Sequence, residues 1–422
     1  MSDKIQNSFL PIPGDKACLL KWSQVSLYLW NNTASSCHRN TGVKIGDDFD
    51  FNNTEPVLKD RTKMLNGEWP NYNRGCEHCK FQELYGGTSD RQQWLQDPYN
   101  KRYVPQELYT DPTAIKVQPT QLSVHFNNKC NMKCVYCDPN FSSAWAKEIE
   151  LFDGKKFLNA TFNLDENADL YSGRLEKFWN WMENNYSKLK AFDILGGEPW
   201  IQRETWDCVD WLIAHPNHDC DFEIYTNMQI KPELFKRNCD HLRALSKTVK
   251  EVVVVMSIDC WGPESEYIRF GHDRATFEEN INYLLQCSDD LHITINATIT
   301  SLSIPYLTLL LDKVIEWNTH LNDKKIDINY NKCMYPEIYN PGIMPGNVYE
   351  KHIEDILSYN DKLFKNTSYK NFVKGMFNEI VQSPPSYDKI DALKTELSKL
   401  DSRRGTNWKE TFPWLTEINK DE

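Results

Sequence analysis

The chain has 422 residues, 40% of them hydrophobic and 26% charged, as in a soluble globular protein of two or three domains. Its net charge of −12 argues against nucleic acid or an anionic membrane as the main partner. The longest apolar run, residues 252–256, is too short to cross a bilayer, and the first residues lack the apolar core of a signal peptide. Thirteen cysteines in such a chain lead us to expect the reducing cytoplasm and metal ligation, not disulfides.

Four cysteines precede residue 110: Cys18, Cys37, Cys76 and Cys79. The alternating pattern of residues 19–30 predicts one strand of a hairpin, and residues 75–79 form a C-x2-C turn. A hairpin with two cysteines, together with such a turn, can close four thiolates around one metal centre. The spacing permits either zinc or a [4Fe–4S] cluster. We expect this region to span residues 1–110.

From residue 119 onward, strand-like and helix-like segments alternate. Strands are predicted at residues 121–126, 191–195, 221–225, 251–258, 292–299 and 326–330. Helices are predicted at residues 172–188, 202–215, 232–246, 275–287 and 303–318. Six such units predict an α/β domain, residues 111–345, with a parallel sheet, right-handed crossovers and ligands at the carboxyl ends of its strands.

The first predicted strand of this domain leads into Cys130, Cys134 and Cys137, spaced C-x3-C-x2-C. Three thiolates on one short loop can hold three irons of a cubane cluster and leave the fourth iron open. A structural zinc site needs four closed ligands, and three cysteines within eight residues cannot all form disulfides. A helix predicted at residues 142–150, with a serine cap, leaves the loop.

The second predicted strand ends in Gly196, Gly197, Glu198 and Pro199. Paired glycines allow a close approach of the backbone to a ligand, and Glu198 can accept hydrogen bonds from an ammonium group. Alone, this tetrapeptide is also compatible with an ordinary turn. Its position one helix after the cysteine loop makes it a candidate ligand site.

These two motifs, with the aromatic Tyr136 before the third cysteine, resemble the radical S-adenosylmethionine (radical SAM) enzyme superfamily. The resemblance implies a partial (βα)6 barrel and a [4Fe–4S] cluster on the three cysteines, whose open iron chelates the amino and carboxylate groups of S-adenosylmethionine. It also implies that Tyr136 lies near the adenine and that the Gly-Gly-Glu-Pro segment binds the cofactor's amino group.

Further cofactor contacts follow from the same resemblance. Residues 257–263 resemble the family's S-[IL]-D-G-P segment with two residues inserted before the glycine. This implies that Ser257 contacts the cofactor's ribose or carboxylate, that Asp259 supports the loop, and that Arg269 pairs with the carboxylate through its two-pronged fork. Asn296 alternates with Thr298 on the fifth predicted strand, so both can face the barrel interior.

The cysteines before residue 80, with the Gly-Glu-Trp-Pro stretch at residues 67–70, resemble a twitch region, which carries an auxiliary cluster in some radical SAM enzymes. In the family this region follows the barrel, whereas here it precedes it. The resemblance implies a second [4Fe–4S] cluster and an electron donor such as flavodoxin or ferredoxin.

The sequence therefore predicts an oxidoreductase-type radical SAM enzyme that cleaves S-adenosylmethionine reductively and abstracts hydrogen, with a peptide or protein side chain as the favoured substrate. A dehydrogenase of a small sugar or nucleotide, or a non-catalytic interaction protein with a zinc site, are the alternatives. Residues 346–422 are predicted to form a helical extension, which packs on the barrel or serves as a partner-binding arm.

Overall fold

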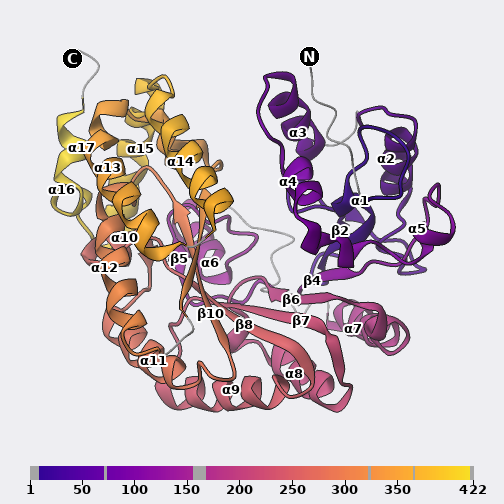
Figure 1. The fold of residues 1–422 in the computed structure, drawn as a ribbon. Helices are drawn as coiled ribbons and strands as arrows, with labels where there is room; N and C mark the ends of the chain where they lie inside the picture. The colour runs from indigo at the N-terminus through magenta and orange to yellow at the C-terminus, as the bar shows by residue number, and fades with distance from the viewer. Residues whose placement is uncertain (1–8, 71–73, 155–167, 322–324, 365, 419–422) are drawn as a thin grey trace.

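The computed structural model describes residues 9–70, 74–154, 168–321, 325–364 and 366–418. One large sheet runs through it (Figure 1). Its strands lie in the order β11 (Asp327–Lys332), β10 (His292–Ile299), β8 (Val249–Ser257), β7 (Asn217–Thr226), β6 (Ala191–Leu195), β4 (Gln121–His125), β1 (Gln24–Tyr28), β2 (Thr33–Ser35) and β3 (Val43–Lys44). The six strands from β4 to β11 are parallel, which confirms the predicted α/β sheet; in the part described, its two edges do not pair with each other.

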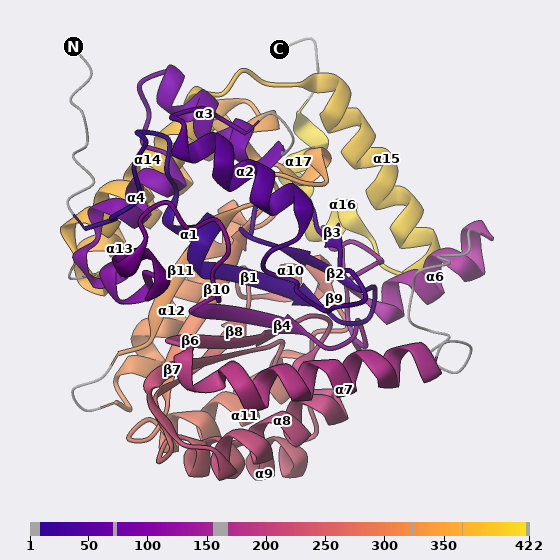
Figure 2. The same ribbon diagram turned by 90° about the vertical axis from the view of Figure 1, so that its right-hand side faces the viewer.

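One face of this sheet is covered by a layer of helices (Figures 1 and 2). They are α7 (Ala168–Asn185), α8 (Arg203–Ala214), α9 (Pro232–Leu245), α11 (Arg274–Gln286) and α12 (Leu307–Asn318). Val124, Ile194 and Ile224 are fully buried in the same core as the apolar sides of these helices. Because successive side chains alternate across a strand, the residues between them lie on the opposite face.

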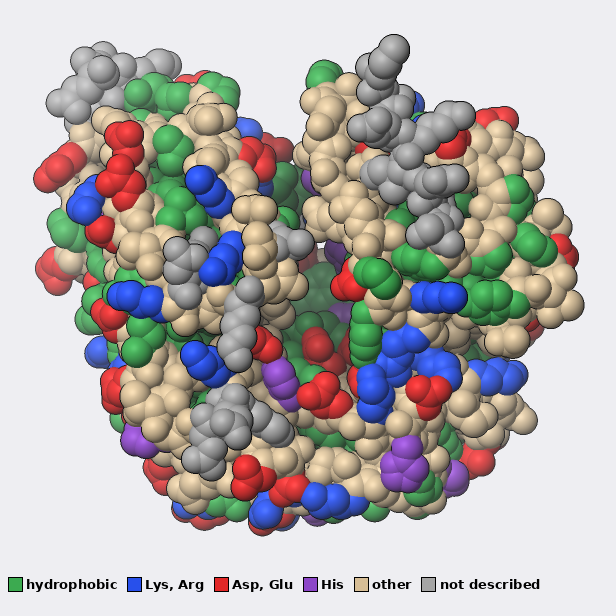
Figure 3. Space-filling model, in the orientation of Figure 1, with side chains coloured by type: hydrophobic (Ala, Val, Ile, Leu, Met, Phe, Trp, Pro, Cys, Tyr) green, Lys and Arg blue, Asp and Glu red, His purple; other side chains and the backbone are tan. Residues whose placement is uncertain are grey.

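The opposite face carries polar groups. Ser123, Asp193 and Glu223 stand side by side on β4, β6 and β7, and the hydroxyl of Ser123 donates to Asp193 at 2.8 Å. Figure 3 shows a hollow between the two upper lobes of the molecule, with acidic, histidine and hydrophobic side chains inside it.

The N-terminal region joins this sheet directly. Strand β1 forms the predicted hairpin with β2, and it also pairs in parallel with β4, so that Ser26 is opposite Ser123. The predicted strand over residues 19–30 begins late, because α1 (Leu19–Ser23) is helical and all five of its residues are buried. A segment enclosed on every side has no polar face to distinguish strand from helix.

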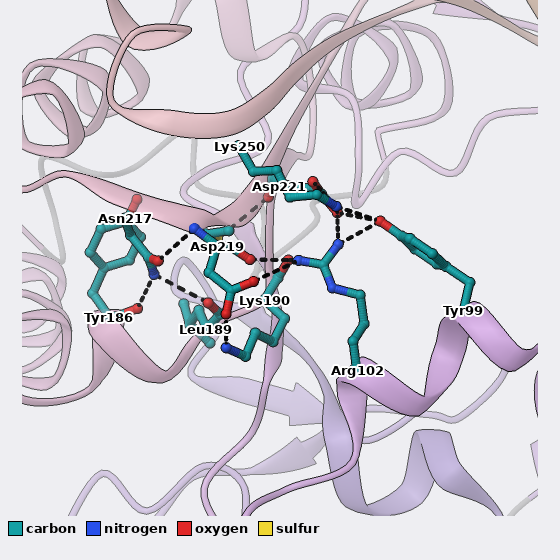
Figure 4. Close-up of polar contacts among 10 residues, drawn as sticks. Tyr99, Arg102, Tyr186, Leu189, Lys190, Asn217, Asp219, Asp221 and Lys250 are labelled. Atoms are coloured by element: carbon teal, nitrogen blue, oxygen red, sulfur yellow. Dashed lines mark hydrogen bonds and ion pairs between the residues drawn. The ribbon is translucent and has the colours of Figure 1, made fainter. Parts of the chain in front are cut away.

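The rest of the N-terminal region is helical: α2 (Glu55–Leu65), α3 (Arg74–Leu84), α4 (Asp90–Gln96), the 3-10 helix η1 (Pro98–Tyr103) and α5 (Glu107–Thr110). A charged cluster fastens η1 to the amino ends of β6 to β8 (Figure 4). Arg102 pairs with Asp221 at 2.5 Å and donates to the carbonyl of Asp219 at 2.5 Å. Lys250 and Asp221 both bond the hydroxyl of Tyr99, which ties the helix to two strands.

The C-terminal helices pack against the sheet domain, as the first of the two predicted alternatives states. They are α13 (Gly346–Leu363), α14 (Thr367–Gln382), α15 (Tyr387–Arg404), α16 (Trp408–Thr411) and α17 (Pro413–Glu417). The buried apolar residues of α15, among them Leu393 and Leu397, belong to the main core. No helix in the described ranges is long and apolar enough to span a membrane.

Arg404, at the end of α15, locks this extension onto α6 (Ser143–Asp153), the helix that follows the three clustered cysteines. Its guanidinium pairs with Glu148 at 3.1 Å, both side chains being almost fully buried, and it stacks on Trp145 and Phe270. Lys133 is a second cation on Glu148, at 2.5 Å. The C-terminal extension therefore braces the cysteine loop through one carboxylate.

We expect Arg404→Ala to lower the free energy of unfolding by about 2–4 kcal/mol, because Glu148 stays buried with only Lys133 to neutralise it. Lys351→Ala is the matched control: it breaks the exposed pair with Asp355 and should cost less than about 0.5 kcal/mol. Chemical denaturation of both variants measures the difference, and equal losses would contradict the bracing role.

Candidate functional site

The loop with Cys130, Cys134 and Cys137 begins directly after β4, at the carboxyl end of the parallel sheet. Helix α6 anchors the cysteine loop from one side, and it begins at the predicted serine cap, Ser142. Ser142 caps the helix at the amide of Trp145, and its hydroxyl donates to the carbonyl of Met132 at 2.7 Å. The indole of Trp145 donates to the carbonyl of Cys134 at 2.8 Å. The loop backbone is thus fixed before any ligand binds.

A short antiparallel ladder anchors the loop from the other side. Strand β5 (Lys133–Cys134) pairs with β9 (Arg269–Phe270), and Cys134 lies directly opposite Arg269. The amide of Val135 extends the ladder by donating to the carbonyl of Ile268 at 2.8 Å. Strand β9 follows α10 (Pro263–Ile268), so the segment after β8 returns to the cysteines.

Tyr136, Asp259 and Arg269 form one buried network. The hydroxyl of Tyr136 donates to Asp259 at 2.8 Å and accepts from Arg269 at 2.5 Å. Arg269 also pairs with Asp259 at 3.4 Å, and the amide of Thr298 donates to the same carboxylate at 3.0 Å. Asp259 therefore contacts the loop through Tyr136, whereas the guanidinium of Arg269, predicted to pair with the cofactor carboxylate, is bonded to protein groups.

The Gly-Gly-Glu-Pro turn crosses the start of the cysteine loop at close range. Gly197 has a φ of +51°, and a Cβ there would lie 2.3 Å from the carbonyl oxygen of Lys129. The amide of Glu198 donates to that oxygen at 2.8 Å. Pro199 opens the short helical turn that follows. The glycines are needed because two stretches of backbone meet here.

Glu198 is 1% exposed and lies beside the cysteine loop. Its carboxylate accepts from the amides of Trp200 at 3.2 Å and Asn227 at 2.6 Å. Burial raises its pKa to about 7 in spite of these amides. No ion pair to Glu198 occurs among the described residues, so a cationic ligand would complement it. Asn227 also bonds Asn131 of the loop, at 2.8 Å.

The remaining predicted cofactor residues lie at the carboxyl ends of β8 and β10. Ser257 and Asn296 are directly opposite each other in the sheet, and the amide of Asn331 on β11 donates to Asn296 at 2.5 Å. Gly196, with a φ of +91°, passes close to His125 on β4. The sheet thus brings all the predicted cofactor residues to the same end as the cysteine loop.

The three thiols of the loop lie within electrostatic range of one another. Burial, followed by the neighbouring thiols, raises the pKa of Cys130 to about 12 and that of Cys137 well above its usual value. In the described ranges, no three His, Cys, Asp or Glu side chains are arranged to hold a single metal ion. A cubane cluster separates its thiolates more widely than one ion does, and thiols held protonated by burial become thiolates when metal binds. The trio therefore has the number of thiolates that a cluster with one open iron needs.

The four N-terminal cysteines also come together. Cys18 precedes α1 and Cys37 follows β2, while Cys76 and Cys79 lie on α3. The predicted turn between the last two is helical, and a spacing of three places both on one helix face. Each thiol lies within electrostatic range of the other three, and burial raises the pKa of Cys18 and of Cys76 to about 12. Cys18 is buried and the other three are half-buried. Four thiols are the number of ligands that a closed cubane cluster needs.

Two buried cations beside this set were not predicted. Lys21 is 1% exposed and pairs with Asp60 at 2.9 Å, within electrostatic range of Cys37 and Cys76. Arg91 pairs with Glu83 at 2.5 Å and lies near Cys18. The burial of Lys21 could have been inferred from its position inside the apolar stretch at residues 19–22. No feature of the sequence indicates that Arg91 is buried.

The two cysteine sets lie at opposite ends of one strand pair. Cys18 is at the amino end of β1, and Cys130 is beyond the carboxyl end of β4, its parallel neighbour. Five residues of strand separate the ends by about 16 Å. The polar face with Asp193 and Glu223 extends across the sheet beside these two strands.

No protein-family model matches the chain, and no curated protein matches its sequence. Among solved structures, it is similar to anSMEcpe with bound AdoMet (17% identity, 61% of this chain and 62% of that chain, TM-score 0.36). It is also similar to *Streptococcus suis* SuiB bound to the precursor peptide SuiA (14% identity, 81% and 69%, TM-score 0.36). The chain thus spans less than two thirds of anSMEcpe.

Proposed function

We propose that this protein is a radical SAM enzyme with an auxiliary metal centre. The observation that carries the proposal is the convergence of two features at the carboxyl end of a parallel sheet: three neighbouring thiols, and the buried carboxylate of Glu198, which has no ion pair among the described residues. Ligands of such sheets bind at that end. A cluster with one open iron, and a carboxylate beside it, suits a ligand with both chelating and ammonium groups.

Bound there, a reduced cluster supplies the electron that cleaves S-adenosylmethionine, and the resulting 5′-deoxyadenosyl radical removes a hydrogen atom from the substrate. The chain's own residues bind and orient. Cys130, Cys134 and Cys137 hold the cluster, and Glu198 accepts from the cofactor's ammonium. Ser257, at the end of β8, and Asn296, opposite it on β10, are proposed to contact its ribose or carboxylate.

We propose that the substrate is a peptide or protein side chain, which would enter through the hollow between the two upper lobes of the molecule (Figure 3). The four N-terminal cysteines are proposed to hold a second [4Fe–4S] cluster. Four thiolates would leave such a cluster no open position, so the chemistry it would supply is electron transfer, as the acceptor of the electron lost when the substrate radical is oxidised. The net reaction is then a two-electron oxidation that consumes one cofactor.

Replacing Cys130, Cys134 and Cys137 together by Ala should remove about one cubane per chain and all cleavage of S-adenosylmethionine, because thiolates are the only iron ligands proposed there. Iron analysis and chromatography of 5′-deoxyadenosine measure both. A triple variant that still releases 5′-deoxyadenosine above background would refute the assignment. Cys208→Ala, in a helix of the outer layer, is the matched control and should lose neither.

Glu198→Gln keeps the side-chain shape but removes the charge that holds the ammonium group. Charge-assisted hydrogen bonds contribute roughly 1.5–3 kcal/mol, so affinity for S-adenosylmethionine should fall about ten- to a hundred-fold. Calorimetry on the reconstituted protein measures this. Unchanged affinity, with the cluster intact, would place Glu198 outside the cofactor site.

Replacing Cys76 and Cys79 by Ala separates the electron-acceptor role from a purely structural one. The acceptor role requires that 5′-deoxyadenosine still forms while the oxidised product disappears. A folded variant with normal product yield would contradict it, and so would a wild-type protein that holds zinc there after anaerobic reconstitution.

A further inference from the structure

The backbone position of Arg269 sets this residue beside the cysteine loop. It is directly opposite Cys134 in the antiparallel ladder of β5 and β9. Directly opposed residues project to the same face, with Cβ atoms about 4.5–5.5 Å apart. Arg269 is 7% exposed, so its charge is buried beside the cysteine that it faces.

The terminal nitrogen Nη1 of Arg269 is engaged by Tyr136 and Asp259. Asp259 is fully buried, and Arg269 forms its ion pair. If the guanidinium moved to a cofactor carboxylate, Asp259 would remain as a buried charge without its cation, which is strongly unfavourable. The structure thus opposes the role that the sequence motif predicts for Arg269.

The inner nitrogen Nε of Arg269 has no hydrogen-bond partner among the described residues, although it is buried. Buried N–H groups are nearly always paired, so an unpaired one indicates a missing acceptor. Cys134 is the residue directly opposite Arg269 in the ladder, so its side chain lies on the same side of the ladder as that of Arg269.

We propose that Arg269 serves the cluster and not the cofactor: its buried charge and free N–H stabilise sulfur on the Cys134 side, which favours the reduced, more negative state of the cluster. Arg269 is then a positioning and tuning residue for electron uptake. This inference rests on the proposed function, because it requires a cluster on the three cysteines.

The test measures two quantities on anaerobically reconstituted protein: the midpoint potential of the loop cluster without S-adenosylmethionine, followed by electron paramagnetic resonance, and the affinity for S-adenosylmethionine. The triple cysteine variant supplies the auxiliary signal to subtract. In Arg269→Gln the potential should become more negative, while cofactor affinity stays within about threefold of wild type. The matched control is Arg274→Gln, five residues after Arg269, which breaks a more exposed ion pair with Glu266. It should change neither the midpoint potential nor the affinity for S-adenosylmethionine.

Because Arg269→Gln leaves Asp259 unpaired, the double variant Arg269→Gln/Asp259→Asn removes both charges together and should show the same direction of shift. If Arg269 instead holds the cofactor carboxylate, affinity falls about ten- to a hundred-fold and the potential without cofactor is unchanged; that result overturns the inference. A wild-type protein without a cluster on the loop overturns the proposed function as well, so the two failures are distinguishable.

Discussion

The two-residue ladder between the cysteine loop and the segment after α10 is the contact on which the site depends. It places Cys134 opposite Arg269 and thereby brings Asp259, from the end of β8, against Tyr136 of the loop. Without this pairing, the loop would be attached through α6, the Gly-Gly-Glu-Pro turn and the hydrogen bonds of Asn131 to the segment after β7. With it, three segments far apart in the sequence hold three thiols in one place. The backbone of the site is therefore held by contacts within the protein.

Each cysteine set is accompanied by a buried cation, which is in turn held by a carboxylate. Arg269 with Asp259 lies at the loop, and Lys21 with Asp60 lies at the N-terminal set. Buried thiols resist ionisation, and a buried cation lowers the cost of the thiolates that a metal requires. The carboxylate keeps the cation in place when no metal is bound. The same physical arrangement thus serves two sets that belong to different parts of the chain.

Most of the sheet domain could be predicted, because its strands are apolar runs and its helices carry one apolar side; β6 and β10 have the bounds expected from the sequence. The end of the sheet that carries the loop, Glu198 and Ser257 followed from the rule for parallel sheets. The parallel pairing of β1 with β4 could not be predicted, since nothing local marks which edge a hairpin will join. The motif that contains Arg269 predicts a contact with the cofactor carboxylate. A motif gives the spacing of residues but not the partner of a guanidinium, so the contacts of Arg269 with Tyr136 and Asp259 could not be predicted. Helix α1 could not be predicted because it is buried on every side, so its sequence has no helical hydrophobic periodicity. The helical segment with Cys76 and Cys79 could not be predicted because it is short and polar, so it shows no such periodicity either.

The central claim is that the two cysteine sets hold two iron–sulfur clusters, of which only the one on the loop has an open iron. Iron and sulfide analysis of the anaerobically reconstituted wild-type protein, combined with electron paramagnetic resonance before and after addition of S-adenosylmethionine, tests it most directly. The account predicts about eight irons and eight sulfides per chain and a change in one of the two reduced signals when the cofactor is added. Zinc in place of iron, or two signals that are both unaffected by the cofactor, would contradict it.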